Sequence, residues 1–140
     1  MIGRRGRRSA CAAVLLVVAG IACGRGGTAP LTELQRVRSG NVDVVLLSPN
    51  DALRHEKDTF FIELRSTSGG ALIDGGTLRV NASMSMSGVP MFGTVDVKRT
   101  DVAGRYEATA YLGMAGRWRL TVEWDGAAEP GSASFSASVL

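Results

Sequence analysis

The segment Thr77-Leu-Arg-Val-Asn-Ala-Ser-Met-Ser-Met-Ser87 alternates apolar and polar residues without interruption. Successive side chains of a β-strand point to opposite faces, so this pattern predicts a half-buried strand. The apolar side of the strand begins at Leu78 and ends in two methionines, Met84 and Met86. Methionine acts either as a flexible core filler or as a soft thioether ligand for Cu(I). The function of the chain depends on which of these roles applies.

The same alternation recurs along the chain, separated by turn sequences such as Ser48-Pro-Asn-Asp51 and Asp74-Gly-Gly76. Apolar residues at every second position predict strands over 42–46, 60–64, 78–86, 95–97, 106–112, 118–124 and 133–139. No helical periodicity follows the first two dozen residues. These patterns predict an all-β fold, an immunoglobulin-like antiparallel β-sandwich of seven or eight strands. A closed barrel fits the same periodicity and remains the alternative.

The first residues are typical of an export signal. Four arginines within residues 4–8 precede an apolar stretch from Ala10 to Ala22, which is too short to span a bilayer comfortably. Gly20-Ile-Ala-Cys23 resembles a bacterial lipobox, although Gly20 replaces the usual Leu or Val. We therefore expect a lipoprotein-type signal peptide over 1–22, lipidation of Cys23, a tether over 23–30 and a β-sandwich domain over 31–140. Ordinary secretion and a retained N-terminal anchor are the alternatives.

Export would change the charge of the chain. Of the 16 basic residues, those that lie before Cys23 are arginines 4, 5, 7 and 8, whereas all 13 acidic residues lie after it. The mature domain then carries a net charge of about −1, so its electrostatics do not favour nucleic-acid binding. Both cysteines, Cys11 and Cys23, precede the domain. Disulfides, thiolate metal sites and cysteine nucleophiles are therefore not expected within it.

The second half of the chain resembles a known family. Its motifs are Met84-Ser-Met86, Met91, Ala103-Gly-Arg-Tyr-Glu-Ala108 and Gly113-Met-Ala-Gly-Arg-Trp-Arg-Leu-Thr-Val122. In this order they are similar to the YtkA-like and FixH-like exported domains, over about half of the chain. The resemblance implies an immunoglobulin-like sandwich anchored outside the cytoplasmic membrane, in some cases beside copper-handling or oxidase-maturation proteins. Relatives with a metal role tend to have a histidine close to the methionine strand, where this chain has Ser87-Gly-Val-Pro90.

Four methionines and one histidine are the candidate metal ligands: Met86, Met91, Met84, Met114 and His55. Thioether sulfurs favour Cu(I), and an imidazole is a common additional ligand. Packing is the competing interpretation for each methionine, most strongly for Met84, which continues the core stripe. A solvated loop residue is the competing interpretation for His55, the only histidine.

Catalysis has little support in the sequence. His55 is the only imidazole base, no Gly-x-Ser-x-Gly motif occurs, and the carboxylates are scattered singly. Trp118 and Trp124 share one strand face, which indicates core, with a carbohydrate-binding platform as the alternative. We therefore expect a non-enzymatic, membrane-anchored binding module that is periplasmic or at the cell surface and handles Cu(I). The alternative is an interaction domain that contacts a membrane-protein partner, with its methionines packed.

Overall fold

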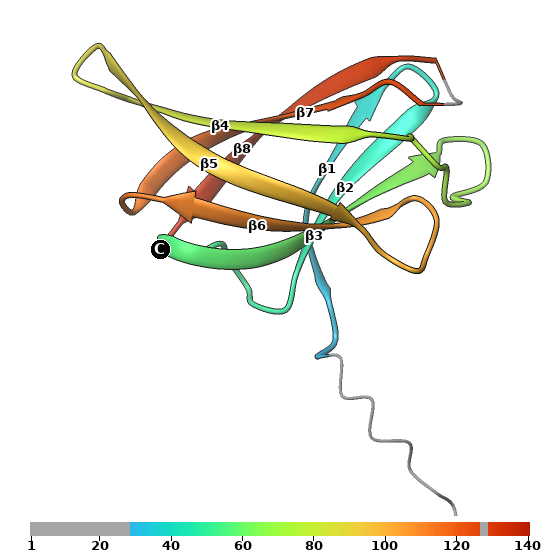
Figure 1. Cartoon of the computed structure of the whole chain (residues 1–140), viewed down its shortest axis with the longest axis horizontal. Coiled ribbons are helices and arrows are strands. Elements are labelled where there is room, and N and C mark those ends of the chain that lie inside the picture. The colour runs from blue at the N-terminus through green and yellow to red at the C-terminus, as the bar shows by residue number, and fades with distance from the viewer. Residues whose placement is uncertain (1–28, 127–128) are drawn as a thin grey trace, which may run out of the picture.

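The computed structural model describes residues 29–126 and 129–140 and contains eight strands (Figure 1). The predicted signal peptide and Cys23 lie outside the described residues, as does most of the tether. No helix in the described part of the chain has the length and apolar character needed to cross a membrane. The strands are β1 (Thr32–Ser39), β2 (Val42–Ser48), β3 (Glu56–Ser66), β4 (Leu78–Met86), β5 (Val89–Arg99), β6 (Arg105–Leu112), β7 (Gly116–Trp124) and β8 (Gly131–Val139).

All strand neighbours are antiparallel, in the order β1-β2-β3-β6-β5-β4-β7-β8. Strand β5 belongs to both layers, because residues 89–93 pair with β4 whereas residues 94–99 pair with β6. The sheet therefore folds over on itself at β5, and the two layers lie face to face (Figure 1). Strands β1 and β8 are the two ends of this order, so the sheet is open. The prediction of a β-sandwich is confirmed.

Gly93 lies where β5 passes from one layer to the other. A Cβ on this residue would stand 2.6 Å from Leu112 Cδ2 and 3.1 Å from the main-chain oxygen of Tyr111. A side chain at this position would therefore push β5 and β6 apart. A glycine is needed at this bend because the neighbouring backbone approaches closely.

The predicted inward residues form the core between the layers. Leu78, Val80 and Ala82 are buried, which confirms the alternation from which the fold was predicted. Trp118 and Trp124 are also buried, so the alternative of a carbohydrate platform built from their exposed rings is wrong. The largest fully buried side chains include Trp118, Tyr106, Phe60, Phe135 and Leu46.

Strand β2 differs from its predicted alternation because it is buried on both faces. Its outward residues Asp43 and Val45 are covered by long side chains of the neighbouring strands. Arg38 donates to Asp43 at 3.0 Å, and Val45 lies in register with Arg36 and Glu63. Arginine stems cover apolar surface while their charged ends pair with carboxylates, and this covering cannot be read from β2 alone.

Tyr106 fixes the turn that leads into β4. Its buried hydroxyl accepts a hydrogen bond from the Gly75 amide at 3.1 Å and donates to the Gly76 carbonyl oxygen at 3.0 Å. A tyrosine that ties a strand start to a distant backbone turn is a feature of immunoglobulin-like sandwiches. Tyr106 begins β6, whereas the candidate residue Met114 follows the other end of this strand. The tyrosine contact and the methionines therefore lie at opposite ends of β6.

Candidate functional site

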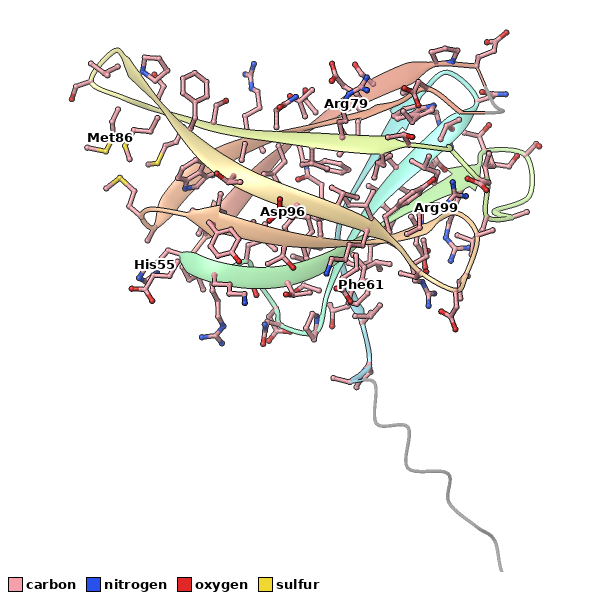
Figure 2. All side chains as sticks on the ribbon, viewed as in Figure 1. His55, Phe61, Arg79, Met86, Asp96 and Arg99 are labelled. Atoms are coloured by element: carbon pink, nitrogen blue, oxygen red, sulfur yellow. The ribbon has the colours of Figure 1, made fainter. Side chains whose placement is uncertain are left out.

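Three of the candidate methionines lie on one face of the β4–β5 hairpin. Met84 and Met91 are direct cross-strand partners, and Met86 is two residues further along the same face of β4. Directly opposed residues of an antiparallel pair have Cβ atoms about 5 Å apart, so these side chains are neighbours. Met86 is 44% exposed, and Met84 and Met91 are half-buried. The hairpin thus presents thioethers at the rim of the core, as the yellow sulfur atoms around Met86 show (Figure 2).

The β6–β7 turn forms a second side of this cluster. The terminal methyl group of Met84 lies against Gly116, where it occupies the place a Cβ would take. Gly116 has a φ of 141°, a backbone conformation that favours glycine. Two residues earlier, the Met114 carbonyl oxygen accepts a hydrogen bond from Trp118 Nε1 at 3.0 Å, and the Met114 side chain packs on the core. The fold therefore places Met114 two residues before the glycine that Met84 contacts.

His55 lies at the same end of the molecule (Figure 2). The next residue, Glu56, pairs with Leu112, so His55 precedes a strand that runs beside the β6–β7 turn. Its Nδ1 lies 2.8 Å from the main-chain oxygen of Leu140, which also accepts the His55 amide at 2.8 Å. This oxygen can only accept, so Nδ1 carries the proton and, in the neutral ring, Nε2 keeps a free lone pair. Metal-binding histidines commonly have this arrangement, with one nitrogen bound to a carbonyl and the other free.

The candidate metal-donor atoms at the methionine end of the domain are thioether sulfurs and one imidazole nitrogen. No group of three or more histidine, cysteine, aspartate or glutamate side chains forms a metal-binding cluster among the described residues. Thioether and imidazole donors suit Cu(I), whereas carboxylate-rich sites suit harder cations. The residues present therefore fit a soft monovalent metal in their chemistry.

A comparison with protein families identifies the fold group of this chain. The family model described as YtkA-like matches residues 36–123. The chain belongs to the YtkA-like family. No match was found among curated proteins or among solved structures. The matched region contains all the candidate ligands of this YtkA-like domain, from His55 to Met114, and ends before β8.

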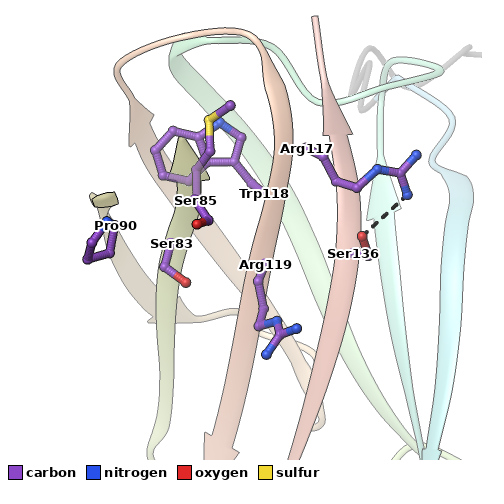
Figure 3. A pocket seen from close by; sticks show the side chains of 8 residues that line it. Ser83, Ser85, Pro90, Arg117, Trp118, Arg119 and Ser136 are labelled. Carbon is purple, nitrogen blue, oxygen red and sulfur yellow. Dashed lines mark hydrogen bonds between the residues drawn. The ribbon is translucent and has the colours of Figure 1, made fainter. Parts of the chain in front are cut away.

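A hollow of about 490 Å³ lies beside the methionine cluster of the YtkA-like domain (Figure 3). Met84 and Trp118 contribute to its inner side. Pro90 also lines it, and its other lining residues are polar or charged. The outward residues are Ser83, Ser85, Arg117, Arg119 and Ser136. The two arginines were not among the functional residues predicted from the sequence, although their alternation with Trp118 indicates that they face outward.

The charged groups with shifted pKa values lie away from the methionines. Hydrogen bonding from the Gly76 amide, aided by Arg99, holds the pKa of Asp74 below its ordinary value. Burial raises the pKa of the Tyr106 hydroxyl, and the Asp74 carboxylate adds to this effect. On β2, the hydrogen bond from Arg38 lowers the pKa of Asp43. These shifts concern the stability of the YtkA-like domain and do not involve the methionines.

Proposed function

We propose that this YtkA-like domain binds Cu(I) as an exported, membrane-anchored carrier and performs no catalysis. The thioethers of Met84, Met86 and Met91 are the main ligands. Met114 and the free Nε2 of His55 complete the set. The observation that carries the proposal is the hairpin register, which sets Met84 directly opposite Met91 with the exposed Met86 beside them. A core-packing role alone does not require an exposed methionine next to two half-buried ones.

A competition titration of Cu(I) against a chromophoric chelator tests this proposal. We expect the purified protein to take up one equivalent of Cu(I), and Met86→Leu and Met91→Leu each to weaken binding about ten-fold or more. Leucine preserves side-chain volume, so the melting temperature stays close to that of the wild type. Phe92→Leu is the matched control, because Phe92 is 78% exposed on the opposite face of the same hairpin. Equal affinities in the wild type and both methionine variants would exclude the site.

We also propose that the chain is exported and lipidated on Cys23, as the sequence indicates. Metabolic labelling with a palmitate analogue is expected to mark the wild type and to miss Cys23→Ser. Labelling of the serine variant, or retention of both forms in the cytoplasmic fraction, would contradict this proposal.

The second candidate function is an interaction domain that contacts a membrane-protein partner. It is supported by the exposed apolar residues of the hairpin, since Val89 is 65% exposed and Phe92 78% exposed. Large apolar side chains gathered on a projecting hairpin are typical of contact sites. The two candidates differ in the copper titration, because packed methionines give no Cu(I) affinity that depends on Met86 or Met91.

A further inference from the structure

The outer face of β7 carries two arginines that differ from the other arginines of the sandwich strands. Each of the six other strand arginines is paired with a carboxylate within 4 Å: Arg36, Arg38, Arg65, Arg79, Arg99 and Arg105. Arg117 and Arg119 have no carboxylate partner in the part of the chain that the structure describes. Both are exposed, and both line the hollow beside the β4–β5 hairpin (Figure 3). Two positive charges without a carboxylate partner therefore lie two residues apart on the outer face of β7.

Hydroxyl groups surround these two guanidinium groups. Arg119 lies in register with Ser83 on β4 and with Ser136 on β8, and Arg117 Nη1 donates to Ser136 Oγ at 3.4 Å. Serine hydroxyls and guanidinium groups are the donors that carboxylates accept from, and an arginine binds a carboxylate through two parallel hydrogen bonds. The hollow thus offers donors on three adjacent strands.

The spacing of the arginines selects an extended peptide. Arg117 and Arg119 are two residues apart on one strand, which places their Cα atoms about 7 Å apart. An extended segment with acidic residues at alternate positions repeats its carboxylates at the same interval. Pro90 borders the hollow and Phe92 lies on the same outer face of the hairpin, so an apolar residue of the segment has a surface to cover.

We propose that this hollow docks an acidic, extended segment of a partner protein. Alternate carboxylates of the segment pair with Arg117 and Arg119. An apolar residue at the next alternate position, whose side chain points to the same face, packs on Pro90 and Phe92. Met84 also lines the hollow, so the docked segment lies against the rim of the methionine cluster. The docking itself requires no copper, and its test is made on metal-free protein.

Fluorescence polarisation tests the docking site in the presence of a copper chelator. The probe is a labelled peptide with aspartate at two alternate positions and leucine at the next alternate position, so that all three side chains share one face of the extended chain. We expect the wild type to bind this peptide, to bind the asparagine-leucine counterpart far more weakly, and to lose affinity as salt increases. Arg117→Gln and Arg119→Gln are each expected to weaken binding about three-fold, and the double variant about ten-fold. Both arginines are exposed, so the unfolding curves of these variants should match that of the wild type.

Arg79→Gln is the matched control, because it removes the same charge from the same outer face but from an arginine already paired with Glu123 and Asp125. It should leave peptide binding within two-fold of the wild type. The proposal is overturned if the peptide fails to bind, if the double variant binds as well as the wild type, or if Arg79→Gln weakens binding as much as Arg119→Gln. It is also overturned if anionic phosphatidylglycerol vesicles bind through Arg117 and Arg119 while the peptide does not.

Discussion

Replacing Tyr106 with phenylalanine tests whether the turn before β4 is held by a single hydroxyl group. The substitution keeps the ring, which is buried to 2% exposure, and removes only the oxygen. The Gly75 amide then loses its acceptor at 3.1 Å, and the Gly76 carbonyl oxygen loses its donor at 3.0 Å. The Gly75 amide is buried, and the Gly76 carbonyl oxygen is partly buried. An unsatisfied buried amide costs about 1–3 kcal/mol, whereas a carbonyl oxygen with a second acceptor site loses less.

We therefore expect Tyr106→Phe to lower the free energy of unfolding by about 2 kcal/mol. For a domain of roughly a hundred residues, this corresponds to a fall of about 8–16 °C in melting temperature. Urea unfolding followed by tryptophan fluorescence gives the free energy, and the slope with denaturant should not change. Cu(I) affinity should also remain unchanged, because the methionines lie at the other end of β6.

Tyr111→Phe is the control for this measurement. Tyr111 lies on the same strand but is 45% exposed, so its hydroxyl can bond to water. Its removal should alter stability by less than about 0.5 kcal/mol. If Tyr106→Phe changes stability as little as Tyr111→Phe does, the hydroxyl does not hold the turn, and the proposed role of Tyr106 is wrong.

Three further predictions concern other parts of the domain. Gly116→Ala should destabilise the domain by about 1–3 kcal/mol and weaken Cu(I) binding, because a Cβ would displace the Met84 methyl group and strain a positive φ. Calorimetry measures the loss of stability, and the copper titration measures the loss of affinity. An unchanged Cu(I) affinity would contradict the contact between Met84 and Gly116. Glu63→Gln should lower the free energy of unfolding, measured in urea, by about 2 kcal/mol, because this carboxylate is 2% exposed and pairs with two arginines. A variant as stable as the wild type would show that these ion pairs make no net contribution to stability. The pKa of Asp74 is lower in the folded chain than in the unfolded chain, so the unfolded chain takes up the proton at a higher pH than the folded chain does. Stability should therefore decline as the pH falls below the ordinary pKa near 3.8. Melting temperatures from pH 5 down to pH 2 measure this decline, and Arg99→Gln should reduce it.

The sequence predicted the two layers of strands, but it did not predict which outward-facing residues are buried by side chains of neighbouring strands. Strict alternation in 78–86 and 118–124 identified the inward residues correctly, since a strand with one buried face leaves its pattern in its own residues. For β2, the sequence predicted one buried face, but both faces are buried, because arginines of β1 and residues of β3 cover Asp43 and Val45. The first strand, over 32–39, was not assigned individually, since its residues are mostly polar and partly exposed.

For the candidate site, too, some properties follow from the sequence and others only from the tertiary structure. The sequence by itself determined which residues were available: four soft sulfurs, one imidazole, and inward or outward parity for every strand residue. Tertiary structure decided how they are arranged, through the pairing of Met84 with Met91, the contact of Met84 with Gly116 at the start of β7, and the Leu140 oxygen that orients His55. It also decided that, within residues 29–126 and 129–140, Arg117 and Arg119 lack the carboxylate partners that the other strand arginines have. Parity is a local property of the extended chain, whereas register and the proximity of separate hairpins depend on how the whole sheet folds over.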